Sequence, residues 1–229
     1  MKQIQAGVQI VGHALWLEKH NTVVIADLHL GIEQMFIERG VFLPKSQKNR
    51  IKEEIKHIID QTHPETLIIN GDLKHEFGKI SRQEWKDTLE ILDYIVGMVK
   101  KIVLVKGNHD TILEPISKKR GLDLCTHLVI DEFFICHGNK LFDNAALKKS
   151  KTIIIGHEHP AMILDDGIRM EKFKCFLVGK YKRKKLIVLP SFNPLFEGTD
   201  IEYESALSPY VKGKFKKYVI AKKEIYIFE

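Results

Sequence analysis

Short apolar runs recur along the chain, and each of them ends in a cluster of polar residues. Continuous runs of Val, Ile and Leu are typical of strands that are buried on both faces of a sheet. The pattern therefore predicts six strands, each followed by its polar cluster, in the segments 22–29, 66–72, 102–110, 133–138, 152–159 and 186–193.

Helical spacing of apolar residues separates the first three of these strands. Isoleucines repeat at helix period from Ile51 to Ile59, and a second helical pattern from Trp85 to Val99 follows a capping box at Ser81 and Glu84. Strands that alternate with helices predict an α/β domain with at least partly parallel strand order. The second half of the chain has strands but few helical patterns, which favours a more antiparallel sheet.

The 229 residues show no internal repeat, no linker and no break in composition. One domain over 1–229 is therefore expected, with a motif core at about 22–195 and basic C-terminal strands at about 180–229. The composition is 44% hydrophobic and 29% charged, which excludes low-complexity and disordered classes of protein.

The cellular compartment is predicted from apolar runs, from the N-terminal segment and from the cysteines. No apolar run approaches the roughly 20 residues of a membrane-spanning helix, and the N-terminus does not resemble a signal peptide, so no membrane partner is expected. The three cysteines, Cys125, Cys136 and Cys175, show no CxxC spacing and cannot all pair. A cytoplasmic protein without a disulfide framework is therefore predicted.

Basic residues are concentrated toward the end of the chain. Residues 179–229 hold 11 Lys and Arg against 6 Asp and Glu, which accounts for +5 of the formal net charge of +6. The main clusters are KYKRKK at 180–185 and KGKFKK at 212–217. Such a segment either steers polyanions toward the protein or forms a solvated hairpin, and the sequence leaves both alternatives open.

The polar clusters that end the predicted strands share one set of chemical groups. In open α/β sheets, sites are built at the C-terminal ends of strands, where loops converge on one crevice. These clusters offer imidazoles, carboxylates and one Asn carbonyl without a thiolate, and such a set suits Mn, Fe or Zn. The candidates are Asp27, His29, Asp72, Asn108, His109, Asp110, His137, His157, Glu158 and His159.

The spacing of the candidates predicts how they are oriented. Alternate side chains of a strand share a face, so Asp27 with His29, and His157 with His159, are each expected to face one metal. By the same alternation, Glu158 is expected to point away. Asp72 follows a glycine and is expected to lie between two cations, an arrangement that supports in-line attack on a phosphate ester.

The blocks DLH, GD, GNHD, CHG and GHEH, in this order, resemble the calcineurin-like metallophosphoesterase superfamily. The resemblance covers about 22–160, with LPSFNPL at 189–195 as an expected closing strand. It implies an α/β fold in which two mixed sheets, flanked by helices, form a single-domain four-layer α-β-β-α sandwich. It also implies a hydrolase that uses two divalent metal ions, with Mn ahead of Fe or Zn.

The resemblance assigns roles to individual residues. It implies that the first metal is held by Asp27, His29, Asp72 and His159. It implies that the second metal is held by Asp72, Asn108, His137 and His157. His109 matches the non-ligand histidine of the family, which protonates the leaving alkoxide or stabilises charge in the transition state. His137 has the least specific motif, and Asp110 either orients His109 or caps its turn.

His75 indicates which branch of the superfamily the chain resembles. Protein Ser/Thr phosphatases have an acidic residue followed by Arg at this position, three residues after the bridging Asp. A His here is similar to SbcD-type DNA repair nucleases, in which it helps to handle the substrate phosphate. The motifs look closest to small stand-alone SbcD-related phosphoesterases, including those called DNA ligase-associated, which lack an extra DNA-capping domain.

The predicted reaction is hydrolysis of a phosphodiester, with nucleic acid as the expected substrate. A metal-bridging hydroxide attacks phosphorus in line, and His109, with His75 as a second candidate, assists departure of the alcohol. A phosphodiesterase or phosphomonoesterase acting on a small nucleotide is the main alternative, and a non-catalytic scaffold of the same fold is a further one. The sequence leaves open a DNA-repair partner protein and the oligomeric state.

Overall fold

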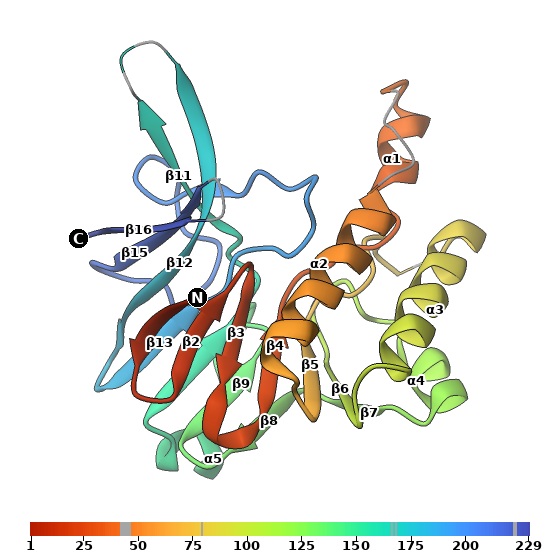
Figure 1. Cartoon of the computed structure of the whole chain (residues 1–229), viewed down its shortest axis with the longest axis horizontal. Coiled ribbons are helices and arrows are strands. Elements are labelled where there is room, and N and C mark those ends of the chain that lie inside the picture. The colour runs from red at the N-terminus through yellow and green to blue at the C-terminus, as the bar shows by residue number, and fades with distance from the viewer. Residues whose placement is uncertain (42–46, 79, 166, 168, 222–223) are drawn as a thin grey trace.

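Two β-sheets packed face to face form the centre of the molecule (Figure 1). The computed structural model describes residues 1–41, 47–78, 80–165, 167, 169–221 and 224–229. Both sheets are mixed, as the α/β sandwich expected from the sequence requires. Buried apolar side chains of both sheets, among them Val24, Ile68, Ile135, Ile154 and Ile187, form the core between them.

The first sheet has seven strands in chain order, and its second half is parallel. Strands β1 to β4 pair antiparallel, whereas β4 to β7 pair parallel. The strands are β1 (Lys2–Gln5), β2 (Val8–Val11), β3 (Ala14–Leu17), β4 (Thr22–Ile25), β5 (Thr66–Asn70), β6 (Lys101–Val105) and β7 (Asp123–Cys125). The C-terminal ends of β4, β5 and β6 therefore lie at the same edge.

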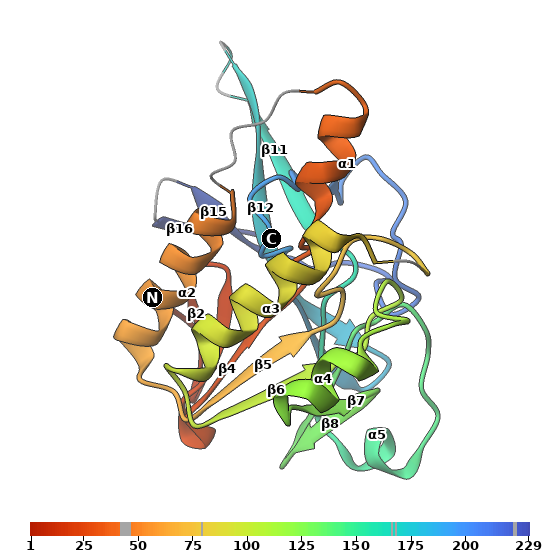
Figure 2. The same ribbon diagram turned by 90° about the vertical axis from the view of Figure 1, so that its right-hand side faces the viewer.

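Helices cover the outer face of the first sheet (Figure 2). They are α2 (Gln47–Thr62), α3 (Arg82–Val96) and α4 (Glu114–Arg120). Helix α1 (Ile32–Glu38) projects beyond the sheet (Figure 1), and a short 3₁₀ helix at Glu18–His20 connects β3 to β4. The predicted apolar stripe of α2, including Ile51, Ile55 and Ile58, is buried against this sheet. Helix α3 begins as predicted, because the side chain of Ser81 accepts a hydrogen bond of 3.1 Å from the amide of Glu84.

The second sheet is built around three parallel strands with antiparallel neighbours. The order is β14-β11-β12-β13-β10-β9-β8, and β15 and β16 branch from β12. Strands β9, β10 and β13 are parallel, and the other described pairs except β11 with β14 are antiparallel. The strands are β8 (His127–Ile130), β9 (Phe133–Cys136), β10 (Thr152–Ile155), β11 (Pro160–Asp165), β12 (Met170–Tyr181), β13 (Lys184–Val188), β14 (Thr199–Asp200), β15 (Lys216–Ala221) and β16 (Glu224–Phe228).

The outer face of the second sheet has a different cover from that of the first. The helix α5 (Ala145–Lys149) is only five residues long. Tyr210 and Phe215, from an irregular segment, pack on this face together with Leu147 of α5. The KYKRKK segment spans the end of β12 and the start of β13, and the described residues contain no helix long and apolar enough to cross a membrane.

Candidate metal centre

The predicted ligands converge at the edge where the parallel strands of both sheets end. Ligand atoms of Asp27, His29 and His159 lie within 4.8 Å of one another, and those of Asp72, His137 and His157 form a second group within the same limit. The carbonyl oxygen of the Asn108 side chain lies 2.8 Å from Nε2 of His137. Loops that are far apart in the sequence thus bring the predicted residues into two adjacent groups.

Asp72 lies between the two groups. Its Oδ2 is 3.2 Å from Nε2 of His137 and 3.7 Å from Nε2 of His29, so one carboxylate oxygen reaches both sides. Burial alone would raise the pKa of Asp72, but the hydrogen bond from His137 and the nearby histidines hold it well below its usual value. The carboxylate is therefore ionised, as a group shared by two cations must be.

The backbone at the ligands is strained. Asp27, His29, Asp72, His157 and His159 have φ values of 57°, 41°, 42°, 67° and 48°, a region that residues other than glycine rarely adopt. Such conformations persist where the surrounding structure enforces them, and they cluster at functional sites.

Each predicted ligand pair does face the site, but the alternation of side chains along a strand is not the reason. Strand β4 ends at Ile25 and β10 ends at Ile155, so both ligand pairs lie beyond the strands. Left-handed turns, not the alternation of an extended strand, direct Asp27 with His29, and His157 with His159, into the site.

Two glycines allow the ligand loops to approach one another. A Cβ atom added to Gly71 would overlap the imidazole of His137, and one added to Gly107 would overlap the carboxylate of Asp72. Only a residue without a side chain fits either position, so the backbone itself forms a wall of the site.

The arrangement fits two divalent cations. Oδ1 of Asp27 and Nδ1 of His137 are buried without a hydrogen-bond partner, and they face one another at 3.4 Å. A buried carboxylate oxygen left unpaired is costly, so Oδ1 of Asp27 indicates that a cation would complete the first group. His137 turns its other nitrogen, Nε2, toward Asn108 and Asp72 of the second group. Nε2 of His29 and Nε2 of His159 also face one another at 3.3 Å. Carboxylate, imidazole and amide donors together suit Mn, Fe or Zn.

The protonation of two histidines is consistent with metal ligation, which requires neutral imidazole. Burial lowers the pKa of His29 well below its usual value, and the neighbouring His159 lowers it further. Burial, followed by the charge of His137, lowers the pKa of His157 to about 4. His137 itself differs: burial would lower its pKa, but the hydrogen bond to Asp72 raises it.

His109 is held with one ring nitrogen toward the ligands. Its Nδ1 forms a hydrogen bond with the carbonyl oxygen of His75, and its amide donates to Oδ1 of Asp72 at 2.9 Å. The other nitrogen, Nε2, lies 3.9 Å from Oδ2 of Asp72. The ring of His109 is thus oriented by backbone contacts and turns Nε2 into the site.

His75 lies in the same cluster of rings. Its Nδ1 is 3.4 Å from Nδ1 of His29, and its Nε2 is 3.4 Å from Sδ of Met35. Burial, followed by the charge of His109, lowers the pKa of His75 to about 4. The ligand-type atoms of His29, His75 and His109 also lie within 4.8 Å of one another, a third group that the sequence did not predict.

Asp110 ties two turns together. Its carboxylate accepts hydrogen bonds from the amides of Gly107 at 2.9 Å, Leu73 at 3.1 Å and Lys74 at 3.3 Å. Of the two roles left open by the sequence, these contacts support the cap of the turn, and they add a link to the loop after Asp72. Burial raises the pKa of Asp110 to about 6, and the charge of Asp72 adds to this increase.

Two further buried carboxylates, both named in the sequence analysis, hold loops near the site in a way that sequence reasoning did not find. Glu84 accepts hydrogen bonds from the amides of His75 at 2.8 Å and Glu76 at 2.7 Å. Glu158 points away from the ligands, as expected, and accepts from the amide of Ser208 at 2.7 Å. The only sequence signals were the capping box, for Glu84, and the position between two ligands, for Glu158.

The expectation that LPSFNPL forms a closing strand is wrong. Strand β13 ends at Val188, before this motif. The hydroxyl of Ser191 donates to the carbonyl oxygen of Asp27 at 2.8 Å, and the side-chain amide of Asn193 donates to that of Leu28 at 2.6 Å. The motif therefore braces the first ligand turn as a loop, and Pro190 cannot donate to a sheet in any case.

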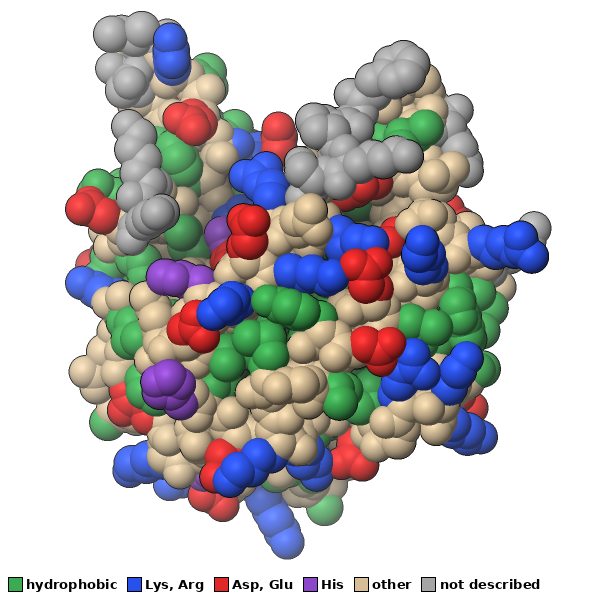
Figure 3. Space-filling view, turned by 45° about the vertical axis from the view of Figure 1, so that its right-hand side comes forward, with side chains coloured by type: hydrophobic (Ala, Val, Ile, Leu, Met, Phe, Trp, Pro, Cys, Tyr) green, Lys and Arg blue, Asp and Glu red, His purple; other side chains and the backbone are tan. Residues whose placement is uncertain are grey.

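The site opens into a cavity of about 630 Å³. Histidines form part of its lining, and Phe36, Leu195 and Phe196 line it as well. The ring of Phe77 is 59% exposed and lies 4.3 Å from the ring of His109, while the ring of Phe196 lies 4.6 Å from that of His29. On one side of the molecule, α1 and the hairpin of β11 and β12 project beside a hollow in the surface (Figure 3).

Comparisons with known proteins identify a family and a similar fold. A family model described as calcineurin-like phosphoesterase matches residues 20–215. The crystal structure of nuclease MPE from Pseudomonas putida matches with a TM-score of 0.69 at 16% identity, over 96% of this chain and 94% of that one. The phosphoesterase YfcE from E. coli matches with a TM-score of 0.42 at 14% identity, over 88% of each chain. No match was found among curated protein sequences.

Proposed function

Because the chain belongs to the calcineurin-like phosphoesterase family and is a metal-dependent phosphoesterase, we propose that it hydrolyses phosphodiester bonds in nucleic acid. The observation that carries the proposal is the position of Asp72, whose Oδ2 reaches His137 on one side and His29 on the other. A carboxylate shared between two groups of ligands is the arrangement used for in-line displacement at phosphorus.

The ligands divide into two sets that share Asp72. The first cation would be held by Asp27, His29, Asp72 and His159. The second would be held by Asp72, Asn108, His137 and His157. Mn is the first candidate metal, with Fe and Zn as alternatives. Two such ions supply positive charge to the phosphoryl oxygens and make water acidic enough to serve as the nucleophile at neutral pH.

His109 is the residue that we assign to the leaving group. Because Nδ1–H donates to the carbonyl oxygen of His75, the free position of the ring is Nε2, which faces the site. When the ring is protonated, Nε2–H passes its proton to the departing alkoxide. His75 holds His109 through its carbonyl oxygen and presents its own ring beside the same cavity.

The surroundings of the site favour a polynucleotide over a small substrate. Phe77 and Phe196 place aromatic rings beside the reacting centre, where they offer stacking surfaces for bases. A protein with the same fold, from Pseudomonas putida, is named as a nuclease. The three free cysteines, two of which are buried, are consistent with a reducing compartment, so we place the protein in the cytoplasm.

Parallel hydrolysis assays test this function. Mn-loaded protein is given bis-p-nitrophenyl phosphate and labelled single-stranded DNA, with EDTA and the Asp72→Ala variant as controls. Metal-dependent cleavage of both substrates, lost in Asp72→Ala, is the expected result. Cleavage of the small diester alone would contradict the nucleic-acid substrate, and cleavage of neither by protein that holds metal would contradict the phosphodiesterase.

A further inference from the structure

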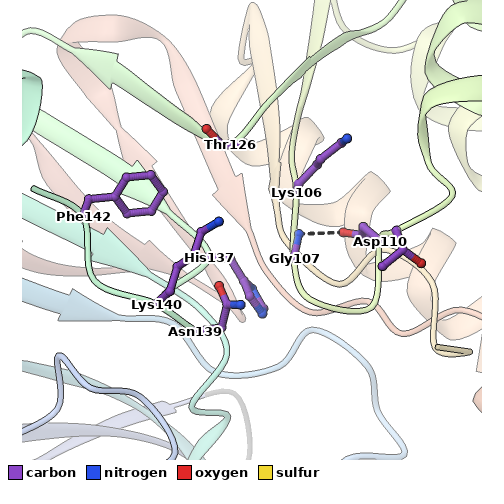
Figure 4. A pocket seen from close by; sticks show the side chains of 9 residues that line it. Lys106, Gly107, Asp110, Thr126, His137, Asn139, Lys140 and Phe142 are labelled. Atoms are coloured by element: carbon purple, nitrogen blue, oxygen red, sulfur yellow. Dashed lines mark hydrogen bonds between the residues drawn. The ribbon is translucent and has the colours of Figure 1, made fainter. Parts of the chain in front are cut away.

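A second cavity, of about 180 Å³, adjoins the metal centre at His137 and the turn between Gly107 and Asp110 (Figure 4). Lys106 reaches it from the end of β6, and Lys140 and Phe142 reach it from the segment after β9. The metal centre therefore continues, on this side, into a small space bordered by two cations and an aromatic ring.

A third cavity, of about 860 Å³, shares one lining residue with the second. Phe142 lines both cavities, and Leu141 and Tyr181 add further apolar surface to the larger one. The side chains of Lys182 and Arg183, at the turn of the KYKRKK segment, also line it. Residues 137–142 thus run from a metal ligand to the basic segment whose role the sequence left open.

Several cations along this path already have partners, which narrows the choice of binding residues. Lys106 pairs with Glu114 at 2.7 Å, and Lys148 pairs with Asp143, the carboxylate of the larger cavity, at 2.9 Å. Lys184 donates to the carbonyl oxygen of Lys148 at 3.0 Å. Because these lysines already bind groups of the protein itself, they are weaker candidates for contacts with a ligand.

The exposed cations Lys140, Lys182 and Arg183 differ, because they form no salt bridge with any residue that the structure describes. Two of them lie against aromatic rings. Nζ of Lys140 lies 5.8 Å from the ring centroid of Phe142, and Nζ of Lys182 lies 5.4 Å from that of Tyr181. Each cavity therefore presents a cation beside an aromatic side chain.

The helical side of the molecule provides a contrast. There, Lys48 pairs with Asp87 at 2.8 Å, and Lys52 pairs with Glu90 at 2.6 Å, so α2 and α3 neutralise one another's charges. The space-filling view shows basic and acidic side chains mixed across this side (Figure 3). The exposed cations Arg50, Arg82 and Lys86 on the same helices form no salt bridge with a described residue, so unpaired charge alone does not distinguish the two sides. The cations beside the second and third cavities differ because they border a cavity next to an aromatic ring.

We propose that residues 139–142 and the KYKRKK hairpin form a track that holds one strand of a polynucleotide on its way from the metal centre. Lys140, Lys182 and Arg183 contact its phosphates, and Phe142 and Tyr181 contact its bases. A charged groove with interleaved aromatic rings is how proteins bind single strands without reading sequence. A duplex fits less well, because its bases are already stacked and cannot lie on the rings.

This track rests on the proposed function, since it names how the substrate of the same site is held. The test compares two triple variants that lose equal charge. The first removes the exposed cations of the track, by Lys140→Gln, Lys182→Gln and Arg183→Gln. The second, a control, removes three exposed lysines elsewhere, by Lys56→Gln, Lys86→Gln and Lys100→Gln. Both are assayed on bis-p-nitrophenyl phosphate, on a dinucleotide and on a single-stranded oligonucleotide of about 12 nucleotides, a length within the usual site sizes.

The track variant is expected to raise KM for the oligonucleotide at least about tenfold at low salt, with little change in kcat. The salt dependence of log kcat/KM should lose about 2 units of slope, since each lost contact with a single strand removes about 0.7. The dinucleotide and the small diester reach only the metal centre, so their kcat/KM should stay within about twofold of wild type. The control variant should keep the oligonucleotide KM near wild type.

Several results would overturn the track. An unchanged oligonucleotide KM in the track variant, with DNA still cleaved, would refute the track and leave the proposed function intact. An equal rise in KM in both triple variants would show that binding follows net charge. Preference for duplex over single strand would refute the single-stranded occupant. If wild-type protein cleaves the small diester but not DNA, the proposed substrate fails and the track fails with it.

Discussion

The two sheets supply the metal centre in different ways. The ligand turns of the first sheet are braced by other side chains: Asp110 links the loops after β5 and β6, and Asn193 holds the turn after β4. The ligand turns of the second sheet depend on the first. The amide of His157 donates to Oδ2 of Asp27 at 2.8 Å, and Nε2 of His137 contacts Oδ2 of Asp72 at 3.2 Å.

The difference assigns distinct tasks to the two halves of the site. The first sheet carries Asp72, the carboxylate that we propose is shared, and His109, which we assign to the leaving group. Asp110 links their loops to one another, while Asn193, from the segment after β13, braces the turn after β4. The second sheet contributes ligands that complete the site but are themselves positioned by the ligands of the first. Changes on the first sheet should therefore damage the reaction in more ways than comparable changes on the second.

The largest expected change is a loss of kcat without loss of metal, in the variant His109→Ala. The ring is not among the ligands that we assign, so both ions should be retained while kcat falls about 10²–10⁴-fold, the usual contribution of a general acid. Metal analysis and kcat on bis-p-nitrophenyl phosphate measure the two properties separately. Near-wild-type kcat would show that the first sheet supplies ligands only.

The next largest change in kcat is expected at one of two buried carboxylates, Glu84 and Glu158, which are compared as a pair. In Glu84→Leu, the amides of His75 and Glu76 lose their acceptor, so the loop that holds His109 should shift and kcat should fall about tenfold. Glu158→Leu removes the acceptor for the amides of Leu207 and Ser208, in a segment that does not hold His109, and should change kcat less than about threefold. Each unpaired buried amide costs about 1–3 kcal/mol, so both variants should show a lower Tm.

Glu84→Gln is the control for this pair. The backbone amides of His75 and Glu76 both donate their hydrogen bonds to the same oxygen of Glu84, Oε1. A glutamine retains this oxygen, so the variant should keep kcat near that of wild type. Equal losses of kcat in Glu84→Leu and Glu158→Leu would remove the distinction between the two halves.

The smallest effect is expected from Phe77→Ala, at the edge of the first half. The ring is 59% exposed, so the free energy of unfolding should change little. Loss of one stacked base should raise KM for single-stranded DNA about fivefold or more, within the usual range of base–aromatic stacking. The control variant Phe77→Tyr keeps an aromatic ring at this position, so its KM should stay near that of wild type. An unchanged KM would show that the exposed ring does not contact substrate.

Local sequence patterns predicted the central strands of both sheets and the two long helices, but not most of the peripheral strands. Continuous apolar runs marked β4, β5, β6, β9, β10 and β13, and helical spacing with a capping box marked α2 and α3. The same runs located the site, because polar residues that follow buried parallel strands must meet at one edge. Candidate ligands such as Asp27 and Asp72 could therefore be named without any knowledge of the turns that hold them.

The orientation of the ligands was not accessible, because long-range contacts determine it. The left-handed backbone of His29 and His157 is enforced by partners more than 40 residues away, such as Asp72 and Asp27. No local pattern marks such a conformation in a residue other than glycine. The links from Asp110 to Leu73 and from Asn193 to Leu28 span 37 and 165 residues of the sequence, and no periodic pattern marks them.

The central claim is that two groups of ligands share Asp72 and hold two ions. Counting metal ions per chain in purified, Mn-loaded wild type, His157→Ala and Asp72→Ala tests it most directly. The account predicts about two ions in wild type, about one in His157→Ala and fewer than one in Asp72→Ala, since only Asp72 belongs to both groups. Two ions retained in Asp72→Ala, or equal losses in the two variants, would contradict it.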